Sequence, residues 1–60
     1  MKTTPSDVAP AYDRGTPYGV YLTYGNTRKF YTFQRALQQK LTKGQRNFVN
    51  ELKNQWLYLP

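Results

Sequence analysis

The chain has 60 residues and a formal net charge of +6, and it contains no cysteine and no histidine. These two absences exclude a disulfide framework, and they remove the usual zinc ligands and the commonest general base. Only Asp7, Asp13 and Glu51 carry carboxylates, and they are too scattered for a paired acid–base site. We therefore expect one small domain that is not an enzyme and needs no metal and no cofactor.

No apolar run approaches the roughly 20 residues of a membrane span, and the first five residues lack the apolar stretch of a signal peptide. A cytoplasmic protein is expected, with no membrane partner and no small-molecule substrate. The positive charge is concentrated, because residues 14–60 carry eight basic side chains against Glu51 alone. A field of a single sign attracts polyanions such as nucleic acid, although it can also serve solubility alone.

Residues 1–17 hold three of the four prolines, together with several small polar residues. This composition predicts a flexible N-terminal arm, followed by a folded basic domain over residues 18–60. A short third strand, contributed either by the arm or by residues 57–59, is an alternative.

Two β-prone runs, residues 18–24 and 27–33, flank Gly25-Asn26. Glycine at the first central position predicts a hairpin with a two-residue type II′ turn. This turn pairs Leu22 with Lys29, whereas a three-residue loop would move one strand's residues to the opposite face. The predicted pairing gives a core face at alternate positions: Tyr18, Val20, Leu22, Tyr24, Tyr31 and Phe33.

The other face of the predicted hairpin places Tyr21 beside Phe30, with Arg28 the next residue along that face. Exposed aromatic rings next to cations can stack unpaired bases or anchor a protein partner. A cross-strand aromatic pair can equally serve only to stabilise the hairpin.

Apolar residues with helical spacing follow the hairpin: Phe33, Ala36, Leu37 and Leu41. Thr32 is placed to cap this first helix through its hydroxyl group. Thr42 and Gln45 fit a capping box, which predicts a second helix from about Lys43. Gly44 favours a break between two helices, and one long helix is the alternative.

The apolar stripe of the second predicted helix consists of Phe48, Val49, Leu52 and Trp56. We expect Trp56 to lie in the core and residues 57–60 to pack back on it. The fold class predicted from these elements is α+β, with a β-hairpin covered by two C-terminal helices.

The polar face of the second predicted helix is rich in basic and amide side chains, which suit phosphates and base edges. An ordinary polar face mixes Glu with Lys, but here Glu51 alone is acidic. Arg46 and Lys53 are expected to point away from the apolar stripe. The residues predicted to bind nucleic acid are Arg28, Lys29, Arg35, Lys40, Lys43, Arg46, Asn47, Asn50 and Lys53.

The function predicted from the sequence is nucleic-acid binding with little sequence preference, DNA being favoured over RNA, mainly through the phosphate backbone. Two alternatives remain open. One is a small interaction protein, such as an inhibitor or assembly factor, that docks on an acidic protein partner. The other is a subunit of a larger particle that orders only on assembly.

Overall fold

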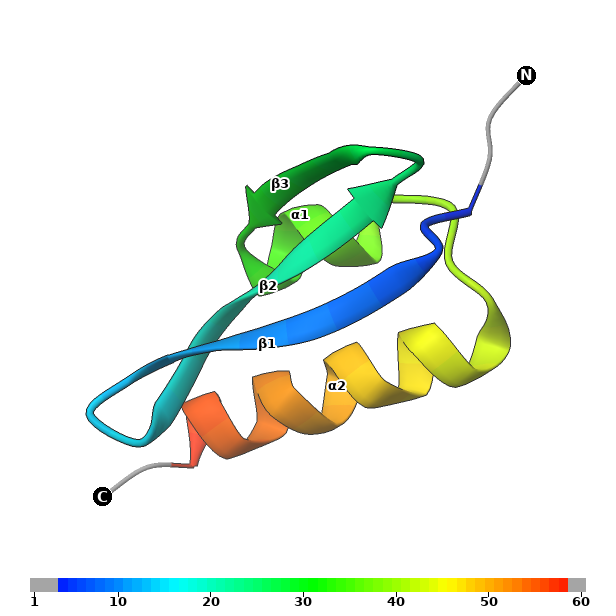
Figure 1. The fold of residues 1–60 in the computed structure, drawn as a ribbon. Coiled ribbons are helices and arrows are strands. Elements are labelled where there is room, and N and C mark those ends of the chain that lie inside the picture. The colour runs from blue at the N-terminus through cyan, green and yellow to red at the C-terminus, as the bar shows by residue number, and fades with distance from the viewer. Residues whose placement is uncertain (1–3, 59–60) are drawn as a thin grey trace.

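The computed structural model describes residues 4–58. Three antiparallel strands in the order β1-β2-β3 precede two helices (Figure 1). This arrangement confirms the predicted α+β class. The elements are β1 (Asp7–Asp13), β2 (Thr16–Tyr24), β3 (Thr27–Tyr31), α1 (Phe33–Leu37) and α2 (Lys43–Leu57).

The prediction of a flexible arm over residues 1–17 is wrong for residues 7–13, which form strand β1. Residues 1–3 lie outside the described residues. Strand β1 pairs with β2 from Asp7, opposite Thr23, to Asp13, opposite Thr16, so the alternative of a third strand from this segment holds. The prolines and polar residues of this segment disfavour regular structure, but backbone pairing with β2 stabilises the strand, and an edge strand tolerates proline. The connecting residues Arg14 and Gly15 have φ values of 56° and 83°, which fit a type I′ turn.

The predicted pairing of β2 with β3 is confirmed, and it includes Leu22 opposite Lys29. Gly25 has a φ of 60°, and among residues 4–58 Arg14 is the one residue other than glycine with positive φ. A positive φ at Gly25 and a negative one at Asn26 agree with a type II′ turn. Strand β3 ends at Tyr31, so Phe33 does not pair with Tyr18 but begins α1.

The core lies between one face of the sheet and both helices, and it is aliphatic apart from one ring. Partial burial, together with the neighbouring Tyr31, raises the pKa of Tyr24 at its edge. Its neutral phenol donates a hydrogen bond to Gln39 Oε1 at 3.4 Å. The buried core residues are Val20, Leu22, Phe33, Ala36, Val49 and Leu52.

Two helices form, as predicted, and the capping box of α2 is present, but α1 ends at Leu37, so Leu41 packs against the core from the connecting loop rather than from a helix. Thr42 Oγ1 accepts a hydrogen bond from the Gln45 backbone N–H at 3.1 Å, and Gln45 Oε1 accepts one from the Thr42 N–H at 2.9 Å. The break between the helices spans residues 38–42, so Gly44 lies inside the first turn of α2 rather than at the break. Neither helix within residues 4–58 is long and apolar enough to span a membrane.

The C-terminal turn of α2 departs from the prediction, because Trp56 is 48% exposed and Phe48 also lies at the rim of the core. Strand β3 pairs with β2 only as far as Val20, so the sheet is two strands wide near Tyr18, and there it leaves Trp56 partly uncovered. The predicted return of residues 57–60 to the core is also wrong for Leu57 and Tyr58, which are 53% and 83% exposed. Residues 59 and 60 lie outside the described residues.

Candidate nucleic-acid interface

The outer face of the sheet, opposite the helices, carries the predicted aromatic pair. Tyr21 and Phe30 are cross-strand neighbours, and their positions alternate with those of the buried Val20 and Leu22. Their ring centroids are 5.5 Å apart in an edge-to-face arrangement. The guanidinium carbon of Arg28 lies 4.6 Å from the centroid of the Tyr21 ring, within the range of a cation–π contact.

Tyr18 extends this pair to a row of three rings. Its ring centroid is 5.5 Å from that of Phe30, and the two residues are 43% and 42% exposed. We call the surface formed by Tyr18, Tyr21 and Phe30 the aromatic face. The rings of Tyr18 and Phe30 are therefore open to a partner, whereas the half-buried Tyr21 ring already carries Arg28 over it.

The prediction that Tyr18 lies in the core is wrong, and a β-bulge is the reason. The strand register shifts between Ala11, which pairs with Gly19, and Tyr12, which pairs with Pro17, so Tyr18 is the extra residue in β2. A bulge breaks the two-residue alternation and redirects the side chain. The local sequence offers a hint of it, because glycine inside a strand often marks a bulge.

Gly19 leaves room for the middle ring of the aromatic face. A methyl group added at Gly19 would overlap the Phe30 ring and would lie 2.8 Å from the Tyr31 carbonyl oxygen. The Phe30 ring therefore packs directly against the backbone of β2, and this contact fixes its position between Tyr18 and Tyr21.

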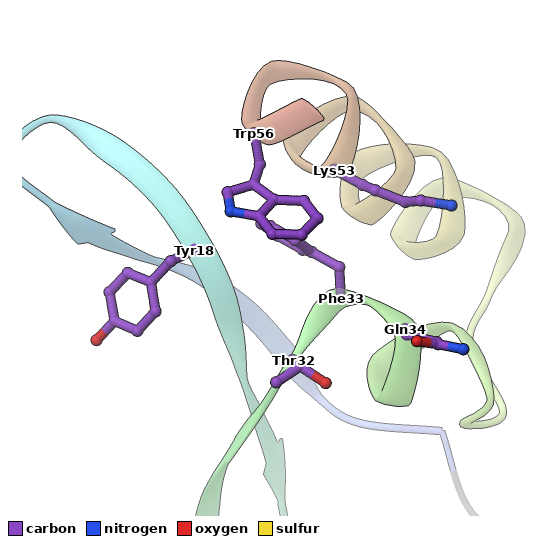
Figure 2. Close-up of a pocket in the computed structure, with 6 residues that line it drawn as sticks. All are labelled: Tyr18, Thr32, Phe33, Gln34, Lys53 and Trp56. Atoms are coloured by element: carbon purple, nitrogen blue, oxygen red, sulfur yellow. The ribbon is translucent and has the colours of Figure 1, made fainter. Parts of the chain in front are cut away.

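A pocket of about 420 Å³ lies beside the aromatic face, between β2 and the two helices. Trp56 and Phe33 form its apolar wall, with ring centroids 5.8 Å apart. Figure 2 shows the indole of Trp56 next to Phe33, with Tyr18 across β2 from them. The residues lining the pocket are Tyr18, Thr32, Phe33, Gln34, Lys53 and Trp56.

The hydroxyl group of Thr32 does not play the role predicted for it. Thr32 occupies the N-cap position of α1, but its side chain makes no capping hydrogen bond. It lines the pocket instead, and it also lines a neighbouring hollow with Phe30, Tyr31 and Arg35. The pocket and the aromatic face are therefore connected through Thr32 as well as through Tyr18.

The nine residues predicted to bind nucleic acid do not form one surface. Arg28 lies on the outer face of the sheet, whereas Lys29, the next residue, alternates to the side that faces the helices. Arg35 and Lys53 border the hollow and the pocket. The others that are exposed on the helical layer are Lys40, Lys43, Asn47 and Asn50.

Two cations of α2 have surroundings that differ from the prediction. The guanidinium group of Arg46 donates a hydrogen bond to the Leu37 carbonyl oxygen at 3.0 Å, so it joins α2 to the end of α1. Lys53 is half-buried along the pocket. Both residues flank the buried side of α2, because a three- or four-residue step on a helix places them beside Val49.

Comparison of the chain with protein-family models, with curated proteins and with solved structures found no match. Within residues 4–58, no cluster of three or more His, Cys, Asp or Glu residues is placed to hold a metal ion. The function is therefore inferred from the aromatic face, the pocket and the distribution of charge.

Proposed function

We propose that the chain is a nucleic-acid-binding domain that holds single-stranded segments on its aromatic face. The observation that supports this proposal is the row of Tyr21, Phe30 and Tyr18 on a sheet face that packs against neither helix, with Arg28 on the same face. Unpaired bases stack on such rings with about 1–3 kcal/mol per base. Every base has a flat face, so this contact carries little sequence preference.

The surroundings of two cations of α2 support a contact surface that includes the edge of the pocket. Arg46 donates one hydrogen bond to the Leu37 carbonyl oxygen, which leaves its charge and its other N–H donors available, and Lys53 lies along the pocket. The remaining cations of the helical layer attract the strand at longer range. Arg28, Arg35 and Lys53 are the cations next to the aromatic rings.

Salt titration of oligonucleotide binding distinguishes the two surfaces. Three phosphate contacts on a single strand give a slope of log K against log salt near about −2. Four to six contacts between a duplex and α2 give roughly −3.5 to −5.5. We expect a labelled oligothymidylate to bind more tightly than a duplex of equal length, with the shallower slope. A flat titration between about 50 and 300 mM salt would contradict nucleic-acid binding altogether.

A second candidate function is docking on an acidic protein partner. The observation that favours it is the exposed apolar end of α2, where Trp56, Leu57 and Tyr58 follow one another. Aromatic residues commonly anchor protein interfaces, and positive charge speeds the encounter with an acidic surface. Capture of one acidic protein from lysate in the presence of nuclease, and loss of that capture in Tyr58→Ala, would favour this function.

A further inference from the structure

We infer that the pocket beside the aromatic face holds one unpaired nucleobase of a bound strand. This inference rests on the proposed function, because it concerns a strand that is bound on the aromatic face. It adds a defined base site, formed by Trp56, Thr32, Gln34 and Lys53, to a face that otherwise offers only stacking.

The first support is continuity between the two surfaces. Tyr18 contacts Phe30 on the aromatic face and also lines the pocket. Thr32 lines the pocket and the hollow that contains Phe30 and Arg35. The Tyr18 ring and the Trp56 indole lie on opposite sides of β2 (Figure 2), so a strand whose bases stack on Phe30 and Tyr18 reaches the pocket round the edge of β2 that β3 leaves unpaired beyond Val20.

The second support is the apolar wall of the pocket. Trp56 packs on one side against Phe33, with the rings tilted by 53°, and still leaves about half of its surface exposed. A flat ring stacked on this indole would cover the surface that the short third strand leaves open. The volume of about 420 Å³ lies within the range of about 300–1,000 Å³ typical of small-ligand pockets.

The third support is the polar rim. A hydroxyl group and a carboxamide, from Thr32 and Gln34, offer both donors and acceptors to the edge of a base. Lys53 supplies a positive charge for the phosphate, and none of the residues that line the pocket is acidic. An aliphatic side chain of a protein partner would use the indole but not these three polar groups, so a nucleotide matches the pocket more completely.

Trp56 is the one tryptophan of the chain, so its fluorescence reports on the pocket directly. We would titrate the unmodified protein with an oligothymidylate at low salt and record both tryptophan emission and the anisotropy of a label on the oligonucleotide. We expect emission to be quenched in parallel with binding. An abasic strand of equal length, which keeps the phosphates but has no bases, should leave the emission unchanged.

Variants test the same site independently. Trp56→Leu should weaken oligothymidylate binding by about 5- to 150-fold, whereas Trp56→Phe, which keeps a ring, should remain within a few-fold. Tyr58→Leu is the matched control, because Tyr58 is an exposed aromatic residue just beyond Trp56 that does not line the pocket, and its affinity should not change. Gln34→Ala, at an exposed position, should weaken binding without unfolding and serves if Trp56→Leu does not fold.

The outcomes separate the base site from the proposed function. Binding without any change in tryptophan emission, and with unchanged affinity in Trp56→Leu and Gln34→Ala, would overturn the base site and leave nucleic-acid binding intact. The absence of any binding would overturn both. Equal quenching by polyglutamate would show that the pocket responds to an acidic polypeptide rather than to a base, and it would also overturn the inference.

Discussion

Apolar side chains alternate between the two faces of the β2–β3 hairpin, but the two faces differ in burial. On the inner face, Val20 and Leu22 are fully buried under α1 and α2. On the outer face, Tyr21 and Phe30 occupy the intervening positions, and Phe30 remains substantially exposed. Cover by a helix, rather than hydrophobicity alone, therefore decides which of these apolar residues hold the fold together and which are available to a ligand.

The largest effect expected from this comparison is on the inner face. Leu22→Ala should lower the free energy of unfolding by about 2–5 kcal/mol, because it leaves a cavity at a fully buried position. A domain of this size has little more stability than that, so the variant should be largely unfolded at 25 °C by circular dichroism. Leu57→Ala, at an exposed position, is the control and should unfold like the parent protein.

Gly19→Ala tests the packing of the Phe30 ring on the outer face of the same strand. The added methyl group would overlap the Phe30 ring and press on the Tyr31 carbonyl oxygen. We expect a loss of about 1–3 kcal/mol in urea-induced unfolding, as for other overpacked sites. A neutral result would mean that the Phe30 ring does not lie against the backbone of β2.

On the outer face, Phe30→Ala should have unequal effects on stability and binding. Loss of a cross-strand aromatic pair costs about 0.2–1 kcal/mol of folding free energy. The affinity for an oligothymidylate should fall by about 5- to 150-fold, because a central stacking surface is removed. If thermal unfolding shows instead that the domain collapses, the outer face is structural in the same sense as the inner one.

The smallest effect should follow charge reversal on the helical layer. Lys43→Glu should weaken oligonucleotide binding only about two- to five-fold, as expected for an exposed charge away from the site. Arg28→Glu should weaken it by at least about tenfold, because this guanidinium group lies on the aromatic face. Equal losses in a filter-binding assay would indicate a net-charge effect without a defined site.

The features predicted correctly from the sequence are those carried by neighbouring residues. The Gly25-Asn26 turn fixes the pairing of β2 with β3, and so it places Tyr21 beside Phe30. The capping box of α2 likewise depends on Thr42 and Gln45 alone. The conformation of each of these features depends on residues that are close together in the sequence, so the rest of the chain does not change the prediction.

The features that the sequence did not predict depend on what lies opposite a residue. Strand β1 is defined by its partner rather than by its own β propensity, and the bulge at Tyr18 is a property of two paired strands. The helical period predicts correctly that Trp56 lies on the side of α2 that faces the sheet, where it packs against Phe33. It cannot predict that the sheet is only two strands wide there, which leaves Trp56 partly exposed. The sequence also did not predict how the cations between Arg28 and Lys43 are placed, because Arg28 lies on the outer face of the sheet whereas Lys40 and Lys43 lie on the side of the helices.

The side chain of Gln45 has a consequence for the cooperativity of the fold. Its oxygen completes the capping box of α2, and its Nε2 donates a hydrogen bond to the Pro5 carbonyl oxygen at 2.8 Å. A glutamate would keep the first bond but has no proton for the second. One neutral carboxamide thus joins residues that are 40 positions apart, and it connects the segment just before β1 with the first turn of α2. We therefore expect the amide protons at the start of β1 and in the first turn of α2 to exchange together rather than independently.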